Sequence, residues 1–116
     1  MSSIAGIHHV TAFCGHPQPN VDFYRDVLGL RMVKVTVNYD DPGTYHLYYG
    51  DELGRPGTIM TFFPWPGANR GVVGNGQVTA IAFAVPKNSI DFWKRRIAST
   101  GFKDIAISTR FDETVI

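Results

Sequence analysis

The sequence predicts an α+β fold built from βαβββ modules, each of which is a strand, a helix and three further strands. Two observations support this prediction. Residues 1–67 show one strand-like pattern, one helix-like pattern and then three strand-like patterns. Farther along, residues 89–93 (SIDFW) repeat the chemical order of residues 20–24 (NVDFY). We therefore expect a complete first module at 1–67, a linker at 68–76 and the start of a second, truncated module at 77–116.

The first predicted strand covers about residues 6–14 and carries two adjacent histidines. Side chains alternate along a strand, so one face should carry His9, Thr11 and Phe13 and the other His8, Val10 and Ala12. A neutral imidazole beside a hydroxyl on a rigid strand is a good start for a metal site. The pair by itself is more often structural, with one histidine hydrogen-bonded in the core and the other half-exposed.

A helix is expected after the loop at 15–20. Asn20 is a candidate N-cap for it. Apolar side chains then recur at helical spacing and predict one buried stripe, formed by Val21, Tyr24, Val27 and Leu28. Gly29 follows as the expected C-terminal stop.

Three more strands are expected at about residues 31–39, 45–50 and 58–63. Alternation in the first of them predicts one dry face, which carries Val33, Val35, Val37 and Tyr39. Asp40 and Asp41 stand next to Pro-Gly and are more typical of a turn than of general bases.

The second module is expected to begin with a strand at 77–85, followed by a helix that Gly101 ends and a strand at 103–109. Residues 110–116 look like a hairpin whose second strand has only just begun. A stable domain seldom ends on an unpaired apolar strand, so we expect the chain to be a fragment of a longer protein.

Composition excludes several classes of protein. The net charge of +1 gives no basic field for nucleic acid, and no apolar run approaches the roughly 20 residues of a membrane span. The N-terminus lacks the basic and apolar regions of a signal peptide. Cys14 is the single cysteine, which excludes an internal disulfide and fits the cytoplasm.

Four other side chains have both a functional and a structural interpretation. His46 is a candidate second metal ligand, although strand histidines beside aromatic residues are usually core or rim groups. Phe62, Phe63 and Trp65 either wall a pocket for an aromatic substrate or belong to the core.

Two segments carry a resemblance to a known family. Residues 7–11 (IHHVT) and 21–30 (VDFYRDVLGL) resemble the vicinal oxygen chelate superfamily, which includes glyoxalase I, bleomycin-resistance proteins and extradiol dioxygenases. Residues 38–51 and 57–64 look like the branch of ring-cleaving dioxygenases that opens hydroquinones. The resemblance implies the glyoxalase-like fold and matches the N-terminal part of those longer proteins.

The resemblance also implies a mononuclear Fe(II) site with two histidines and one carboxylate, with Mn(II) or Zn(II) as alternatives. By family position His9 is the first metal ligand, and His8 and Thr11 are catalytic groups near the substrate. His8 is then the group that accepts or returns a proton. The resemblance places the remaining histidine and carboxylate in later modules, beyond Ile116, and the strand at 58–63, which has no carboxylate, fits this expectation.

The implied function is the opening of hydroquinone- or catechol-like aromatics with O₂. A glyoxalase-like metal-dependent isomerase and a metal-free binding module of the bleomycin-resistance type are the alternatives. We expect the 116 residues alone to be inactive as a dioxygenase, and we expect the protein to form a homo-oligomer that covers its open sheet edges. The sequence identifies neither the ring substituents nor the position of cleavage.

Overall fold

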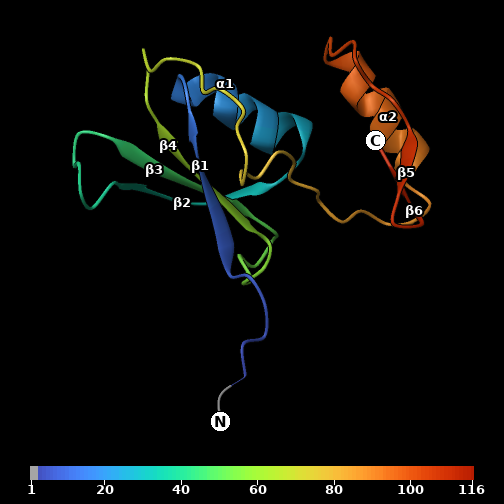
Figure 1. The fold of residues 1–116 in the computed structure, drawn as a ribbon, viewed down its shortest axis with the longest axis horizontal. Helices are drawn as coiled ribbons and strands as arrows, with labels where there is room; N and C mark the ends of the chain where they lie inside the picture. Colours follow the sequence, from blue (N-terminus) through green and yellow to red (C-terminus); the bar gives the residue numbers. More distant parts are fainter. Residues whose placement is uncertain (1–2) are drawn as a thin grey trace. The chain divides into compact units, whose positions relative to one another are not determined.

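The computed structural model describes residues 3–116 and divides into two compact units, one ending at Arg70 and the other spanning Gly71–Ile116. The first unit has the order β1 (His9–Cys14), α1 (Pro17–Val21), η1 (Asp22–Val27), β2 (Arg31–Val37), β3 (Tyr45–Gly50) and β4 (Ile59–Pro64). The second has α2 (Ile90–Ser99), β5 (Ser108–Arg110) and β6 (Glu113–Val115). The βαβββ order predicted for the first unit is confirmed (Figure 1).

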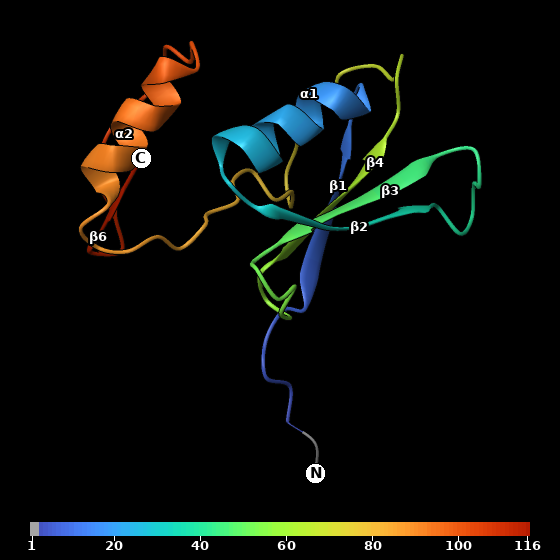
Figure 2. The ribbon, with the colours of Figure 1, turned by 180° about the vertical axis from the view of Figure 1, so that it is seen from behind.

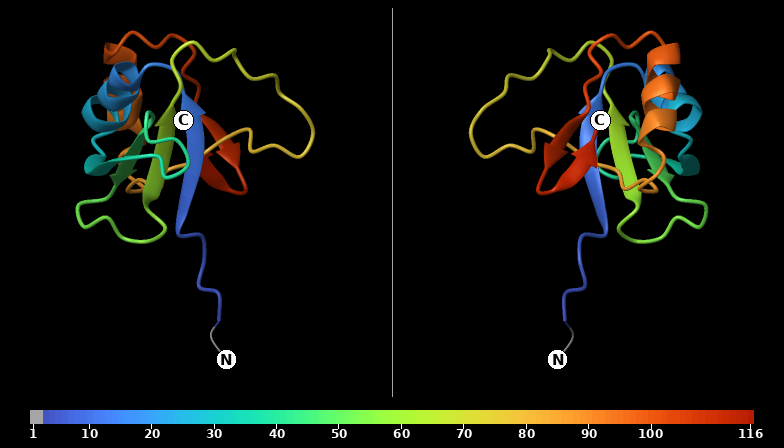
Figure 3. Two further views of the ribbon diagram at one scale, coloured as in Figure 1. Left: turned by 90° about the vertical axis from the view of Figure 1, so that its left-hand side faces the viewer. Right: turned by 90° about the vertical axis from the view of Figure 1, so that its right-hand side faces the viewer.

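One four-stranded sheet organises the first unit, with the strand order β1-β4-β3-β2. β1 runs parallel to β4, while β4 with β3 and β3 with β2 are antiparallel. The helical segment that α1 and η1 form lies against one side of this sheet (Figures 1 and 2). β1 and β4 run side by side (Figure 3). The parallel pairing places Thr11 beside Thr61 and Phe13 beside Phe63.

The core of the first unit lies between this sheet and the helical segment. Its four buried members come from β3 and β4, namely Leu47, Tyr49, Met60 and Phe62. Alternate residues of β1 pack against them together with the helical stripe, namely Val10, Ala12, Cys14, Val21 and Tyr24. The period-two alternation predicted for β1 is confirmed, because His9, Thr11 and Phe13 are exposed on the other face.

The helix of the first unit begins earlier than the sequence predicts. Its first residue is Pro17 and its N-cap is His16, so the expectation that Asn20 caps it is wrong. The fixed φ of proline suits the first turn of a helix, where its missing N–H is not needed. Asn20 therefore lies inside the helix, where its side chain accepts a hydrogen bond of 2.8 Å from the Tyr49 hydroxyl.

The dry face expected on residues 31–39 is wrong. The ladder between β2 and β3 shifts register between Met32 and Lys34, so Val33 is an extra residue in the strand. Met32 reaches the core, but Val35 and Val37 are 48% and 53% exposed. β2 is an edge strand, and alternation alone cannot show how far a helix covers an edge.

The second unit is less regular than predicted. Residues 77–85 form no strand, and the strand expected at 103–109 is present only from Ser108. A strand needs a neighbour for its backbone hydrogen bonds, and residues 77–85 pair with no strand of the described chain. The hairpin predicted for 110–116 is confirmed, since Phe111 and Asp112 both have positive φ and join β5 to β6.

The described helices include none that is long and apolar enough to cross a membrane.

Candidate functional site

The face of the sheet that points away from the helical segment carries the candidate site. Cross-strand pairing places Thr11 opposite Thr61, and Thr61 opposite Tyr48. On the same face, His9 lies two residues before Thr11, and His46 lies two residues before Tyr48. Polar and aromatic groups from three strands therefore share one face.

Four of these side chains form a hydrogen-bonded row across β3, β4 and β1. The Tyr48 hydroxyl is 2.8 Å from Nδ1 of His46, and Nε2 of His46 is 3.0 Å from Oγ1 of Thr61. Oγ1 of Thr61 is in turn 2.8 Å from Oγ1 of Thr11. We call this set the Tyr48–Thr11 row; its members are Tyr48, His46, Thr61 and Thr11.

Thr61 is the central member of the row and links Thr11 to His46. It is fully buried, so water cannot replace either of its two hydrogen bonds. His46 is partly buried against the Phe63 ring, with 4.0 Å between the ring centroids. Burial lowers the pKa of His46, and the positive charges of His9 and Lys34 lower this pKa further. These influences all favour the neutral form of the His46 imidazole.

His8 and His9 lie together at the start of β1 and are both exposed. Their rings are edge to face, and their Nδ1 atoms are only 3.1 Å apart. The expectation that the two side chains point in opposite directions is wrong. β1 begins at His9, so His8 lies just outside the strand that would impose the alternation.

The two imidazoles provide a donor set for a metal that is incomplete by itself. His9 stands on a rigid strand, and a ring nitrogen of it suits one position of the metal site in which two histidines and one carboxylate bind the same face of the ion. Such a site also needs a second histidine and a carboxylate. Within residues 3–116 no three histidine, cysteine, aspartate or glutamate side chains lie close enough together to hold a metal ion. His46 is tied to Thr61 and Tyr48 by its two ring nitrogens, which leaves neither free to bind a metal.

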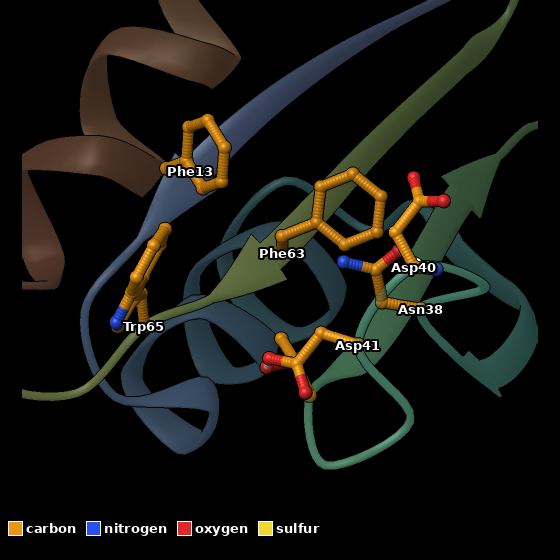
Figure 4. Close-up of a pocket in the computed structure, with 7 residues that line it drawn as sticks. Phe13, Asn38, Asp40, Asp41, Phe63 and Trp65 are labelled. Carbon is orange, nitrogen blue, oxygen red and sulfur yellow. Dashed lines mark hydrogen bonds between the residues drawn. The ribbon is translucent and has the colours of Figure 1, made fainter.

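An open pocket of about 280 Å³ lies on the first unit, near the ends of β1 and β4 (Figure 4). Three aromatic rings line one part of it, those of Phe13, Phe63 and Trp65, and polar side chains line another, including Asn38 and Asp40. The ring of Phe13 is 6.0 Å from that of Phe63 and 5.8 Å from that of Trp65. The lining of this open pocket therefore combines aromatic rings with polar side chains.

Phe62 does not line this pocket. It is 5% exposed and packs in the core against Tyr24 and Tyr49. Asp41 acts as a turn former, as its sequence context suggests, and accepts hydrogen bonds from the Gly43 amide and the Thr44 hydroxyl.

Two members of the row were missed by reasoning on the sequence. Thr61 is the one hydroxyl inside the apolar run of β4, and Tyr48 follows His46 with the spacing that puts both on one face. Those two patterns were available in the sequence. What was missing was the parallel pairing of β1 with β4, which brings Thr61 beside Thr11.

The fold is that of a glyoxalase-type protein. The chain belongs to the Glyoxalase/Bleomycin resistance protein/Dioxygenase superfamily, whose family model matches residues 6–114. A solved structure described as a "putative dioxygenase from Bacillus subtilis" superimposes with a TM-score of 0.89 at 57% identity, over 94% of this chain and 35% of that one. The fosfomycin resistance protein FosX of Listeria monocytogenes shares the fold, with a TM-score of 0.65 at 11% identity, over 97% of this chain and 90% of that one.

Two proteins that are similar to this chain in sequence carry names of ring-opening dioxygenases. The "Putative ring-cleaving dioxygenase MhqO" of Bacillus subtilis (strain 168) is 64% identical over 79% of this chain and 30% of its own length. The chlorohydroquinone/hydroquinone 1,2-dioxygenase of Sphingobium indicum is 36% identical over 95% of this chain and 35% of its own length. The chain thus spans about a third of the length of these relatives.

Proposed function

We propose that these residues form the N-terminal part of an Fe(II)-dependent, extradiol-type dioxygenase that opens hydroquinone- or catechol-like rings with O₂. The observation that carries the proposal is the likeness to MhqO at 64% identity, together with an open sheet face that bears His9 and Thr11, with His8 in contact with His9. The name of the Sphingobium relative supports hydroquinones as the substrate class.

In this proposal His9 is the metal ligand that the chain supplies. Its ring stands at the first position of β1, where the ladder to β4 fixes the backbone. Bound Fe(II) would supply a Lewis-acidic centre that favours ionisation of a phenolic oxygen and binds O₂. The other ligands must come from residues that are not grouped around His9 in the described part of the chain.

His8 is proposed as the group that moves a proton. Its Nδ1 is 3.1 Å from Nδ1 of His9, so in the neutral pair one ring donates and the other accepts. An exposed imidazole has one ring nitrogen that can take a proton from a bound phenol and later return it. Thr11 lies two residues after His9 on β1 and presents its hydroxyl to the same face of the sheet as His9.

The decisive test compares three histidine variants of the natural protein that contains these residues, purified without oxygen. His9→Ala should lose bound iron and all oxygen uptake with substituted hydroquinones. His8→Ala should retain iron but lose turnover. His16→Ala, in the loop before α1, is the matched control and should change neither. Loss of iron in His8→Ala with iron retained in His9→Ala would overturn the assignment.

The 116-residue chain alone should consume no oxygen with hydroquinones and added Fe(II), because its described residues group no three ligands. Turnover that disappears in His9→Ala would show that copies of the chain complete the site together.

We also propose a homo-oligomer, since β1 and β2 leave both sheet edges open in the first unit. The cytoplasm is the proposed location, as expected for a chain whose single cysteine is the free thiol of Cys14.

A further inference from the structure

The Tyr48–Thr11 row ends at a proposed catalytic side chain, and nothing in the proposed function explains its other members. His46 has one hydrogen-bond partner at each ring nitrogen, the Tyr48 hydroxyl at Nδ1 and the Thr61 hydroxyl at Nε2. A neutral imidazole has one donor nitrogen and one acceptor nitrogen. The two partners must therefore play opposite roles, and only two orders of protons along the row are possible.

Tyr48 selects between these two orders. A phenol O–H is more acidic than the alcohol O–H of threonine and so is the better donor to an imidazole nitrogen. The ammonium group of Lys34 lies 5.5 Å from the centre of the Tyr48 ring, where its charge strengthens the O–H as a donor. Tyr48 thus donates to Nδ1 of His46, and the ring proton is left on Nε2.

The proton on Nε2 then determines the rest of the row. Nε2–H donates to Oγ1 of Thr61, which is fully buried, so its hydroxyl cannot form a hydrogen bond with solvent water instead. The single hydroxyl proton of Thr61 is left for Oγ1 of Thr11, 2.8 Å away. Thr11 accepts this hydrogen bond, and its own proton is free to point out from the exposed sheet face.

We propose that His46 is a positioning residue, whose Nε2–H tautomer is selected by Tyr48 and makes the Thr11 hydroxyl a hydrogen-bond donor on the open face of the sheet. Such a donor fits an ionised or partly ionised phenolic oxygen and disfavours ligands that offer only a donor. The effect on turnover rests on the proposed function, whereas the order of the protons does not.

This arrangement requires a neutral His46 ring, because only a neutral ring has a tautomer. The rings of Phe63 and Tyr48 pack on His46, with centroids 4.0 Å and 4.1 Å away, and the charges of His9 and Lys34 act on it from β1 and β2. Burial and these two charges lower the pKa of His46 and so favour the uncharged ring.

Nitrogen NMR of the natural protein labelled with ¹⁵N-histidine tests the proton order directly. At about pH 8, where an ordinary histidine is neutral, His46 should show a protonated Nε2 and an unprotonated Nδ1. Tyr48→Phe should shift His46 toward the other tautomer, since Nδ1 loses its donor. Tyr45→Phe removes a hydroxyl from the same strand but outside the row and should leave the tautomer unchanged. An Nδ1–H tautomer in the unmodified protein, or no change in Tyr48→Phe, would overturn the proposal.

Turnover tests the positioning role. His46→Gln keeps an N–H donor at the place of Nε2 and should keep kcat/KM within about twofold, whereas His46→Leu should lower it about three- to tenfold, the value of one net hydrogen bond. Both variants should retain iron. Equal kcat/KM in the two variants would overturn the positioning role. If the unmodified protein turns over no hydroquinone at all, the proposed function fails, and the tautomer experiment still decides the proposal.

Discussion

Thr61→Val removes one buried hydroxyl and changes almost nothing in the volume of the side chain. The hydroxyl takes part in two hydrogen bonds, of 2.8 Å to Thr11 and 3.0 Å to His46. Two such hydrogen bonds contribute about 2 kcal/mol net to the free energy of unfolding. The methyl group that replaces the buried hydroxyl removes a polar group from the core, which offsets about 1 kcal/mol of this loss. We therefore expect the first unit to lose about 1 kcal/mol of stability.

Hydrogen exchange of the backbone amides of β3 and β4 measures this loss where it arises. A loss of about 1 kcal/mol corresponds to exchange that is about fivefold faster. Thr36→Val is the matched control: Thr36 pairs with His46 from β2 but stands outside the row, and its replacement should change exchange by less than about twofold. Equal effects of the two substitutions would refute the view that the row stabilises the sheet.

Two further predictions concern the first unit. Burial raises the pKa of Tyr49 from 10.0 to about 12, so the unfolded chain loses the phenol proton at a lower pH than the folded chain does. The free energy of unfolding should therefore fall as the pH rises between these two values. In a plot of the urea unfolding midpoint against pH, Tyr49→Phe should flatten this part of the curve. Gly54→Ala should lower the melting temperature more than Gly67→Ala. Both positions have positive φ, but a Cβ on Gly54 would lie 2.8 Å from a methyl of Val33 while one on Gly67 meets no atom within 4 Å. Equal shifts in the two glycine variants would contradict the steric argument.

The fold of the first unit was predictable because its local signals agree with each other. The alternation of residues 9–14, the helical stripe and Gly29 all indicate the same order of elements, and the structure has that order. The bulge at Val33 was not predictable, because the residues on either side of it read as one regular alternation. Residues 77–85 were misjudged for a related reason, since a pattern shows which residues suit a strand but not whether a neighbouring strand is present.

The candidate site was predictable only in part. The positions of His9 and Thr11 on one face follow from their spacing on β1, and their exposure on the face away from the helix fits a site. The contact of His8 with His9 depends on where β1 begins, a boundary that a propensity pattern locates only to within a few residues. Their roles as metal ligand and catalytic group stay predictions.

The Tyr48–Thr11 row shows why the missing part of the site could not come from spacing alone. Thr11 and Thr61 are fifty residues apart, and their contact exists only because β4 runs parallel to β1 and inserts between β1 and β3. A parallel neighbour aligns side chains in rows across the strands, so a hydroxyl buried at the centre of the sheet can link groups on both sides of it. The same sheet gives His9 no second or third ligand within the described residues. The exposed face of this sheet therefore carries one hydrogen-bonded row, and under the proposed function any further metal ligands would have to come from residues that are not grouped around His9 in the described part of the chain.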